Sequence, residues 1–75
     1  MEITDIVSKN LKYFREKRGL SVIDLAKICK VAKQTIYQIE DGTNWIGLKT
    51  VQKVCEALDI EEHELFQFEK RSTNN

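Results

Sequence analysis

The chain has 75 residues, enough for one domain, and its formal net charge of zero gives no overall basic signature of a nucleic-acid-binding protein. It has no apolar run of about 18 residues, and its first residues, MEITDIVSKN, lack the basic and apolar regions of a signal peptide. We therefore expect a single cytoplasmic domain that is not held in a membrane.

Cysteine and histidine are too scarce for a metal or redox site. Cys29 and Cys55 are too far apart for a CxxC metal site, and the one histidine, His63, does not supply the missing zinc ligands. We expect both thiols to be reduced and packed in the core, with no metal and no cofactor. No nucleophile is spaced for a relay with His63 and no glycine-rich phosphate loop occurs, so the sequence argues against an enzyme.

The composition favours an all-α domain, since proline is absent, glycine occurs three times and no strand-like alternation is present. Caps and apolar spacing predict helices over about 4–17, 22–29, 32–41, 48–58 and 61–68. Ser21 is the expected N-cap of the second helix, and Gly19 and Gly42 are expected to end the first and third. The predicted core is Val7, Leu11, Phe14, Leu25, Ala26, Cys29, Val31, Ile36, Ile39, Leu48, Val51, Val54, Cys55, Leu58, Leu65 and Phe66. We expect the domain to span residues 1–69, followed by a polar, frayed tail at 70–75.

Charge is divided unevenly along the chain although its sum is zero. Residues 9–33 carry eight bases and two acids, a net charge of +6, whereas residues 54–69 carry six acids and no base, a net charge of −6. The first segment suits a polyanion, and the second would be repelled by one.

The segment VAKQTIYQIEDG (31–42) forms a helix-turn-helix pattern with the helix before it. Only two or three residues around Lys30 and Val31 join the two helices, and Ala26 is small where the second helix must approach closely. With Ile36 and Ile39 facing inward, the polar side of the second helix is free to enter a groove of DNA.

The stretch LKYFREKRGLSVIDLAKICKVAKQTIYQIEDG, with LKTVQKVCEALDIEEHELF after it, resembles the Cro/CI-type (XRE) helix-turn-helix family of bacterial and phage transcription regulators. The resemblance spans roughly residues 11–66. It implies a compact, five-helix, lambda-repressor-like fold, with the helix-turn-helix at the second and third helices, that binds double-stranded DNA as a homodimer. The expected function is a small stand-alone repressor or controller protein that reads a palindromic operator through the major groove.

The resemblance and the helical spacing together assign the DNA contacts. Base contacts are expected from Lys33, Gln34, Tyr37 and Gln38. Glutamine pairs with adenine N6 and N7, and lysine donates to guanine O6 and N7. The expected phosphate contacts are Ser21, Lys12, Lys30, Thr35, Thr43 and Asn44. Arg15 stays open between a phosphate contact and a packing or salt-bridge residue.

Four positions depart from the family pattern. Val22 replaces the usual glutamine at the start of the second helix, and Asp41 replaces an asparagine and would repel a phosphate. Lys30 replaces the turn glycine, so it must either adopt a left-handed conformation at about 1 kcal/mol or reshape the turn. Ala32 replaces the serine N-cap of the recognition helix, a loss of about 1 kcal/mol.

The loop before the fourth helix also departs from the family, with Trp45, Ile46 and Gly47 in place of Asn-Pro-Ser. Trp45 and Ile46 either cap the core beneath that helix or make a dimer contact. The dimer interface is the preferred interpretation for Ile46 and for Phe68, which lies past the end of a family domain, and Trp45 fits either one.

Two classes of function follow from these features. The first is a DNA-binding regulator, and phage Cro-like repressors, restriction–modification controllers and antitoxin-type repressors all fit this size. The second is a protein-interaction module or antitoxin-type adaptor on the same fold, with weakened DNA binding and an acidic half that docks a regulatory protein partner. The KQTIYQ face argues against the second class, and salt-dependent DNA binding distinguishes the two.

Overall fold

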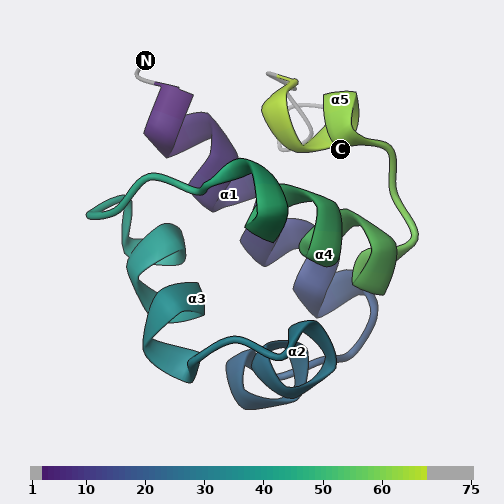
Figure 1. Ribbon diagram of the computed structural model, residues 1–75. Coiled ribbons are helices and arrows are strands. Elements are labelled where there is room, and N and C mark those ends of the chain that lie inside the picture. Colours follow the sequence, from purple (N-terminus) through teal and green to yellow (C-terminus); the bar gives the residue numbers. More distant parts are fainter. Residues whose placement is uncertain (1–2, 68–75) are drawn as a thin grey trace.

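The structure is a computed structural model that describes residues 3–67, and every regular element in this range is a helix (Figure 1). The helices are α1 (Ile3–Lys17), α2 (Val22–Cys29), α3 (Lys33–Asp41), α4 (Leu48–Leu58) and α5 (Glu62–Phe66). The all-α prediction is confirmed. Of the helices in this range, none is both long and apolar enough to cross a membrane.

The helix bounds follow the sequence signals closely. The second and fourth helices have the expected bounds, and α3 begins one residue late because Ala32 has extended backbone and serves as its N-cap. Gly19 and Gly42 both have positive φ, as expected after the first and third helices. The fifth helix is shorter than expected, because Glu61 and Gln67 have extended backbone and serve as its N-cap and C-cap. Phe68, the last residue of the expected helix, and the expected tail at 70–75 lie outside the described residues.

The five helices surround one core. The helix α1 packs against α3 and α5, while α2 packs against α3 and α4, and α4 also contacts α5. In Figure 1, α4 crosses in front of α1, with α2 at one end of the molecule and α5 at the other. This arrangement leaves α3 packed on its inner side by α1 and α2.

The core matches the predicted set with one wrong assignment, Leu48, and two additions, Val22 and Ile46. Its buried hydrophobic members are Val7, Leu11, Phe14, Val22, Leu25, Ala26, Cys29, Ile36, Ile39, Ile46, Val51, Val54, Cys55, Leu58 and Leu65. Val31 and Phe66 are partly buried against it. The prediction for Leu48 was wrong, because this side chain is 69% exposed. Side chains lean toward the N-terminus of their helix, so the first residue of α4 projects past the core, and Ile46 fills the space from the loop.

A buried amide joins the first helix to the last. The side chain of Asn10 on α1 donates hydrogen bonds to the backbone oxygens of Leu65 and Gln67, each at 2.8 Å. These bonds satisfy carbonyl groups at the end of α5 that have no partner inside that short helix. Asn10 therefore holds α5 on α1 at the end of the molecule away from α2.

Candidate nucleic-acid interface

The turn between α2 and α3 keeps its tight shape although it lacks a glycine. Lys30 adopts the left-handed conformation, with φ 60° and ψ 44°, which is the first of the two outcomes expected for this position. The N–H of Lys30 donates to the oxygen of Lys27 at 3.2 Å, and that of Val31 donates to the oxygen of Ala26 at 3.0 Å. The geometry of a glycine C-cap is thus retained at a cost of about 1 kcal/mol.

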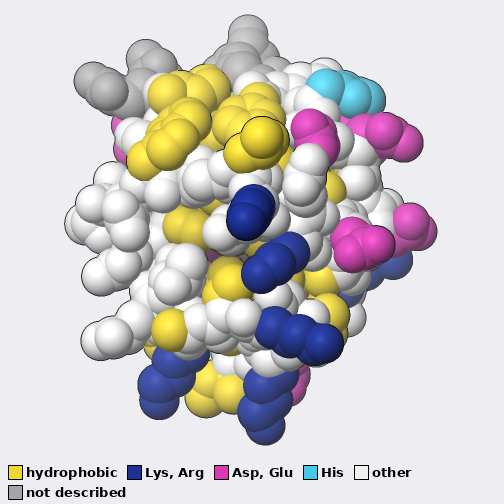
Figure 2. All heavy atoms as spheres, viewed as in Figure 1, with side chains coloured by type: hydrophobic (Ala, Val, Ile, Leu, Met, Phe, Trp, Pro, Cys, Tyr) yellow, Lys and Arg dark blue, Asp and Glu magenta, His cyan; other side chains and the backbone are white. Residues whose placement is uncertain are grey.

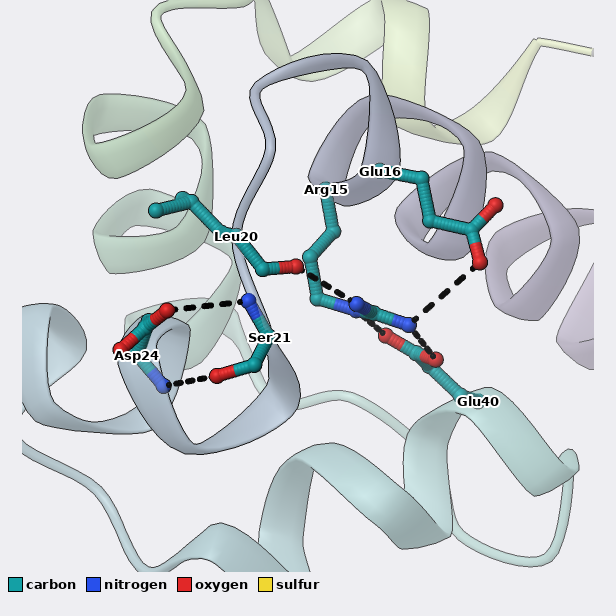
Figure 3. Close-up of polar contacts among 6 residues, drawn as sticks. All are labelled: Arg15, Glu16, Leu20, Ser21, Asp24 and Glu40. Carbon is teal, nitrogen blue, oxygen red and sulfur yellow. Dashed lines mark hydrogen bonds and ion pairs between the residues drawn. The ribbon is translucent and has the colours of Figure 1, made fainter.

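The start of α2 is closed by a reciprocal pair of hydrogen bonds (Figure 3). The Asp24 N–H donates to Ser21 Oγ at 3.0 Å, and the Ser21 N–H donates to Asp24 Oδ2 at 3.2 Å. These bonds confirm Ser21 as the N-cap and lower the pKa of the Asp24 carboxyl. A phosphate approaching Ser21 would also meet the carboxylate of Asp24.

The start of α3 has no such cap. Ala32 has the extended backbone of an N-cap residue but offers no side-chain acceptor, and the Thr35 N–H bonds only to the Ala32 oxygen, at 2.9 Å. The first turn of α3 also lacks an acidic residue and carries Lys33 instead. The helix that is expected to read DNA is therefore weakly stabilised at its own N-terminus.

The other end of α3 is anchored to α1 by a buried ion pair (Figure 3). Arg15 Nε donates to Glu40 Oε2 at 2.7 Å, and Arg15 Nη2 donates to Glu40 Oε1 at 3.0 Å. Both side chains are 10% exposed, and Arg15 Nη1 also donates to the Leu20 oxygen at 2.7 Å. The hydrogen bonds that Arg15 donates to the Glu40 carboxylate raise the pKa of the guanidinium. Arg15 is thus a salt-bridge residue, and it fixes α3 to α1 and to the loop before α2.

Glu40 was missed at the level of the sequence, although a signal for it exists. It lies four residues after Ile36 and next to Ile39, both of which face the core, so it belongs to the inward side of α3. A carboxylate placed there requires a basic partner, because an unpaired buried charge is very costly. Arg15, which faces inward from the last turn of α1, is that partner.

The outward side of α3 carries the four expected base-contact residues. We call this surface the recognition face, and its members are Lys33, Gln34, Tyr37 and Gln38. All four side chains are exposed, Tyr37 at 47%, while Ile36 and Ile39 on the opposite side are buried. The structure thus brings these residues together on one face of the helix, and their contacts with bases remain a prediction.

Two of the expected phosphate contacts are bound to the recognition helix itself. Thr43 Oγ1 donates to the Gln38 backbone oxygen at 3.3 Å, and Asn44 Nδ2 donates to Gln38 Oε1 at 3.1 Å. The Trp45 N–H in turn donates to Asn44 Oδ1 at 3.1 Å. The loop after α3 is therefore folded back on the end of the recognition face. Of the other expected phosphate contacts, Lys12 and Lys30 are exposed and Thr35 is partly buried.

An exposed apolar patch lies where the loop meets α4 and α5. Trp45 is 53% exposed and Leu48 is 69% exposed, and the ring of Trp45 lies 6.4 Å from that of Phe66 between centroids. Figure 2 shows hydrophobic side chains gathered at one end of the molecule as viewed, near acidic side chains and the histidine. We call Trp45, Leu48 and Phe66 the apolar patch.

The preferred interpretation of Ile46 as an exposed interface residue is corrected by the structure. Its side chain is 2% exposed and belongs to the core beneath α4, which is the alternative that the sequence left open. An isoleucine two residues before α4 can turn inward because Gly47 has extended backbone and places α4 over it. Phe68, the other preferred interface residue, lies outside the described residues.

Both cysteines are free and buried, as the sequence predicted. Burial raises the pKa of the Cys29 thiol. For Cys55, burial and then the neighbouring carboxylates of Glu62, Glu64 and Glu61 raise the pKa to about 11. Both are therefore protonated and unreactive near neutral pH, since the thiolate is the reactive form.

Comparison with known proteins gives consistent matches over most of the chain. The family model described as Helix-turn-helix (HTH_3) matches residues 11–65. An uncharacterized HTH-type transcriptional regulator from Methanocaldococcus jannaschii is 33% identical over 63 residues, which cover 84% of this chain and 96% of that protein.

Two solved structures resemble the fold of this chain over most of its length. The restriction-modification controller protein C.AhdI from Aeromonas hydrophila superposes with a TM-score of 0.81 at 30% identity, over 84% of this chain and 96% of that one. The N-terminal DNA binding domain of SinR from Bacillus subtilis superposes with a TM-score of 0.80 at 28% identity, over 88% of this chain and 97% of that one. The matched family and these relatives are regulators of transcription and not enzymes.

Proposed function

We propose that this chain, which belongs to the Cro/CI-type (XRE) helix-turn-helix family of transcription regulators, binds double-stranded DNA sequence-specifically through the recognition face of α3. The observation that carries the proposal is the difference between the buried inner side and the exposed polar outer side of α3. Its inner side is fixed by two buried isoleucines and the Arg15–Glu40 ion pair, while its outer side presents four exposed polar side chains. A helix held in this way can enter the major groove without losing its packing.

The distribution of charge supports an approach to DNA from the side of α3. The bases of the front segment include Lys30 in the turn and Lys33 at the start of α3, both of them exposed. The acids of α5 lie on a helix that packs against α1 and α4. We assign phosphate contacts to Lys12, Lys30 and the loop after α3, and base contacts to the recognition face.

We further propose that the chain acts in the cytoplasm as a homodimer, with the apolar patch at the contact between the two copies. Exposed Trp45 and Leu48 suit such a contact, since large apolar side chains anchor interfaces. A twofold dimer would present two copies of α3 to successive major grooves about one helical turn apart. We favour the role of a small repressor or controller, because the chain is similar to the controller protein from A. hydrophila.

Fluorescence anisotropy with the duplex upstream of this protein's own gene, and with a scrambled duplex, tests the DNA-binding proposal. We expect tight binding that prefers the upstream duplex and weakens steeply with salt, because phosphate neutralisation releases counterions. Gln34→Ala should remove the preference, whereas Gln52→Ala, an exposed glutamine on α4, should leave it intact. Weak and equal binding to both duplexes would instead favour a protein-interaction module that docks a regulatory partner.

Sedimentation equilibrium tests the dimer separately. Leu48→Asp should convert the dimer to monomer and weaken operator binding, since a charge cannot be buried unpaired in the interface. Ile28→Asp is the matched control, because Ile28 is 52% exposed on α2, away from the apolar patch. Equal molecular masses for the two variants would contradict the proposed interface.

A further inference from the structure

We propose that Asn44 is a specificity-determining residue, because it fixes the Gln38 amide so that only N–H donors face the DNA. Gln38 then selects guanine over adenine at the base pair that it reads. The inference rests on the proposed function and deepens it, since it names the base chemistry of one side of the recognition face. It starts from two contacts that join the loop to Gln38 of α3 and from a third contact within the loop, between Trp45 and Asn44.

The orientation of both amides is fixed by a chain of donors and acceptors. The Trp45 N–H is a donor, so the Asn44 atom 3.1 Å from it must be the oxygen, Oδ1. The other end of the Asn44 amide is then the donor Nδ2, and the Gln38 atom 3.1 Å from it must be the oxygen Oε1. Turning over either amide would place two donors or two acceptors against each other.

The loop holds Asn44 in this position through its backbone. Gly42, with φ 76°, ends α3, and its N–H donates to the Ile39 oxygen at 3.1 Å. The Thr43 N–H donates to the Gln38 oxygen at 3.1 Å, and its hydroxyl donates to the same oxygen. The residue that follows is thereby brought beside the Gln38 side chain, six positions earlier in the sequence.

A glutamine held in this way reads bases differently from a free glutamine. Recognition of adenine uses both ends of the amide, because N7 accepts a hydrogen bond and the N6 amino group donates one. Guanine presents two acceptors, O6 and N7, so it suits a group that offers only N–H donors. With Oε1 occupied by Asn44, the remaining amino group of Gln38 favours guanine and disfavours adenine.

The same helix contains an internal comparison. Gln34 lies four residues before Gln38, and within the described residues its side chain has no hydrogen-bond partner. Both ends of its amide are available, so Gln34 keeps the bidentate pairing with adenine. Two glutamines on one face are thus given different base preferences by their neighbours.

Selection from a randomised duplex library, followed by sequencing, tests the inference with the full chain. Gln38→Ala identifies the base pair read by Gln38 as the position whose preference disappears. At that position we expect the wild type to prefer guanine over adenine by about tenfold, and Asn44→Ala to lower this ratio by fivefold or more. Gln52→Ala is the matched control, since it removes an exposed side-chain amide on α4 and leaves the hydrogen bond between Asn44 and Gln38 intact.

Each outcome bears on the inference in a defined way. A preference for adenine in the wild type, an unchanged ratio in Asn44→Ala, or no position affected by Gln38→Ala would overturn the role of Asn44 while DNA recognition stands. The absence of any enriched sequence would overturn the proposed function and the inference together. Unchanged thermal unfolding of Asn44→Ala, followed by circular dichroism, shows that a lowered ratio does not come from loss of the fold.

Discussion

The two helices of the helix-turn-helix are held by opposite means. Helix α2 is stabilised locally by the Ser21–Asp24 hydrogen bonds and by four buried side chains among its eight residues. Helix α3 has no N-cap bond, follows a left-handed lysine and buries only Ile36 and Ile39. Its position depends on distant partners, above all Arg15 on α1. In the proposed function the outer face of α3 meets DNA, and the helix is accordingly positioned mainly from its inner side.

The largest effect is expected from breaking the distant anchor of α3. Glu40→Ala removes the two short hydrogen bonds from the buried guanidinium of Arg15 to a carboxylate, and leaves it the Leu20 oxygen and the exposed carboxylate of Glu16 at 4.0 Å. We expect this change to lower the free energy of unfolding by about 3 kcal/mol. Chemical denaturation followed by circular dichroism measures this change. For a domain this small, such a loss removes much of the total stability.

The control for that variant is an exposed ion pair between an arginine and a carboxylate, Arg18 with Asp59. Arg18 lies 3.9 Å from Asp59, with side chains 44% and 92% exposed. Arg18→Ala should cost less than about 1 kcal/mol, because water screens exposed pairs. If Glu40→Ala were no more destabilising than Arg18→Ala, α3 would not depend on its distant anchor.

Removing the N-cap of α2 and adding one to α3 should reduce the difference in stability between the first turns of the two helices. Ser21→Ala should destabilise the protein by about 1 kcal/mol, and Ala32→Ser should stabilise it by a similar or smaller amount. Hydrogen exchange of the first-turn amides of each helix measures the local effect. We expect slower exchange at the start of α3 in Ala32→Ser. Unchanged exchange would show that the N–H groups of its first turn already have hydrogen-bond acceptors.

Relief of the left-handed turn should have a smaller effect. Lys30→Gly removes the steric cost at φ 60°, but it also makes the unfolded chain more flexible. We expect a net gain of about 0.5 kcal/mol from these opposing terms, measured by thermal unfolding. A loss of stability would mean that the side chain of Lys30 contributes more than its strained backbone costs.

The smallest effect concerns pH and the local cap of α2. The pKa of Asp24 is lowered in the folded protein by its bonds with Ser21, so its stabilising contribution is present above the pKa of the unfolded chain. That contribution is lost as pH falls through the folded pKa. The difference in melting temperature between wild type and Asp24→Ala should therefore shrink from pH 7 to pH 3, and a constant difference would contradict the account.

Local features of the fold were predictable from the sequence. The bounds of α2 and α4 followed from a cap and an apolar stripe, and the short turn left Lys30 two options, of which it takes the left-handed one. The exchange of Leu48 for Ile46 in the core was not predictable, because it depends on how the loop enters α4.

The sequence predicted which residues of α3 face outward, but not the hydrogen bonds and ion pairs that hold the residues of this helix. The spacing of Ile36 and Ile39 places the recognition face outward, and the structure has it there. The partners of α3 are distant in sequence or lie in an irregular loop, as Glu40 with Arg15 and Gln38 with Asn44 illustrate. Periodicity carries no information about such pairs, since they are set by tertiary packing.

The central claim is that the outer side of α3 is the surface that meets DNA. An NMR titration of the isotope-labelled chain with the duplex upstream of its own gene tests it most directly. We predict that the largest amide shifts fall within residues 30–38 and at the start of α2, with the amides of α5 little changed. Shifts centred on α5, or none at saturating duplex, would contradict the claim.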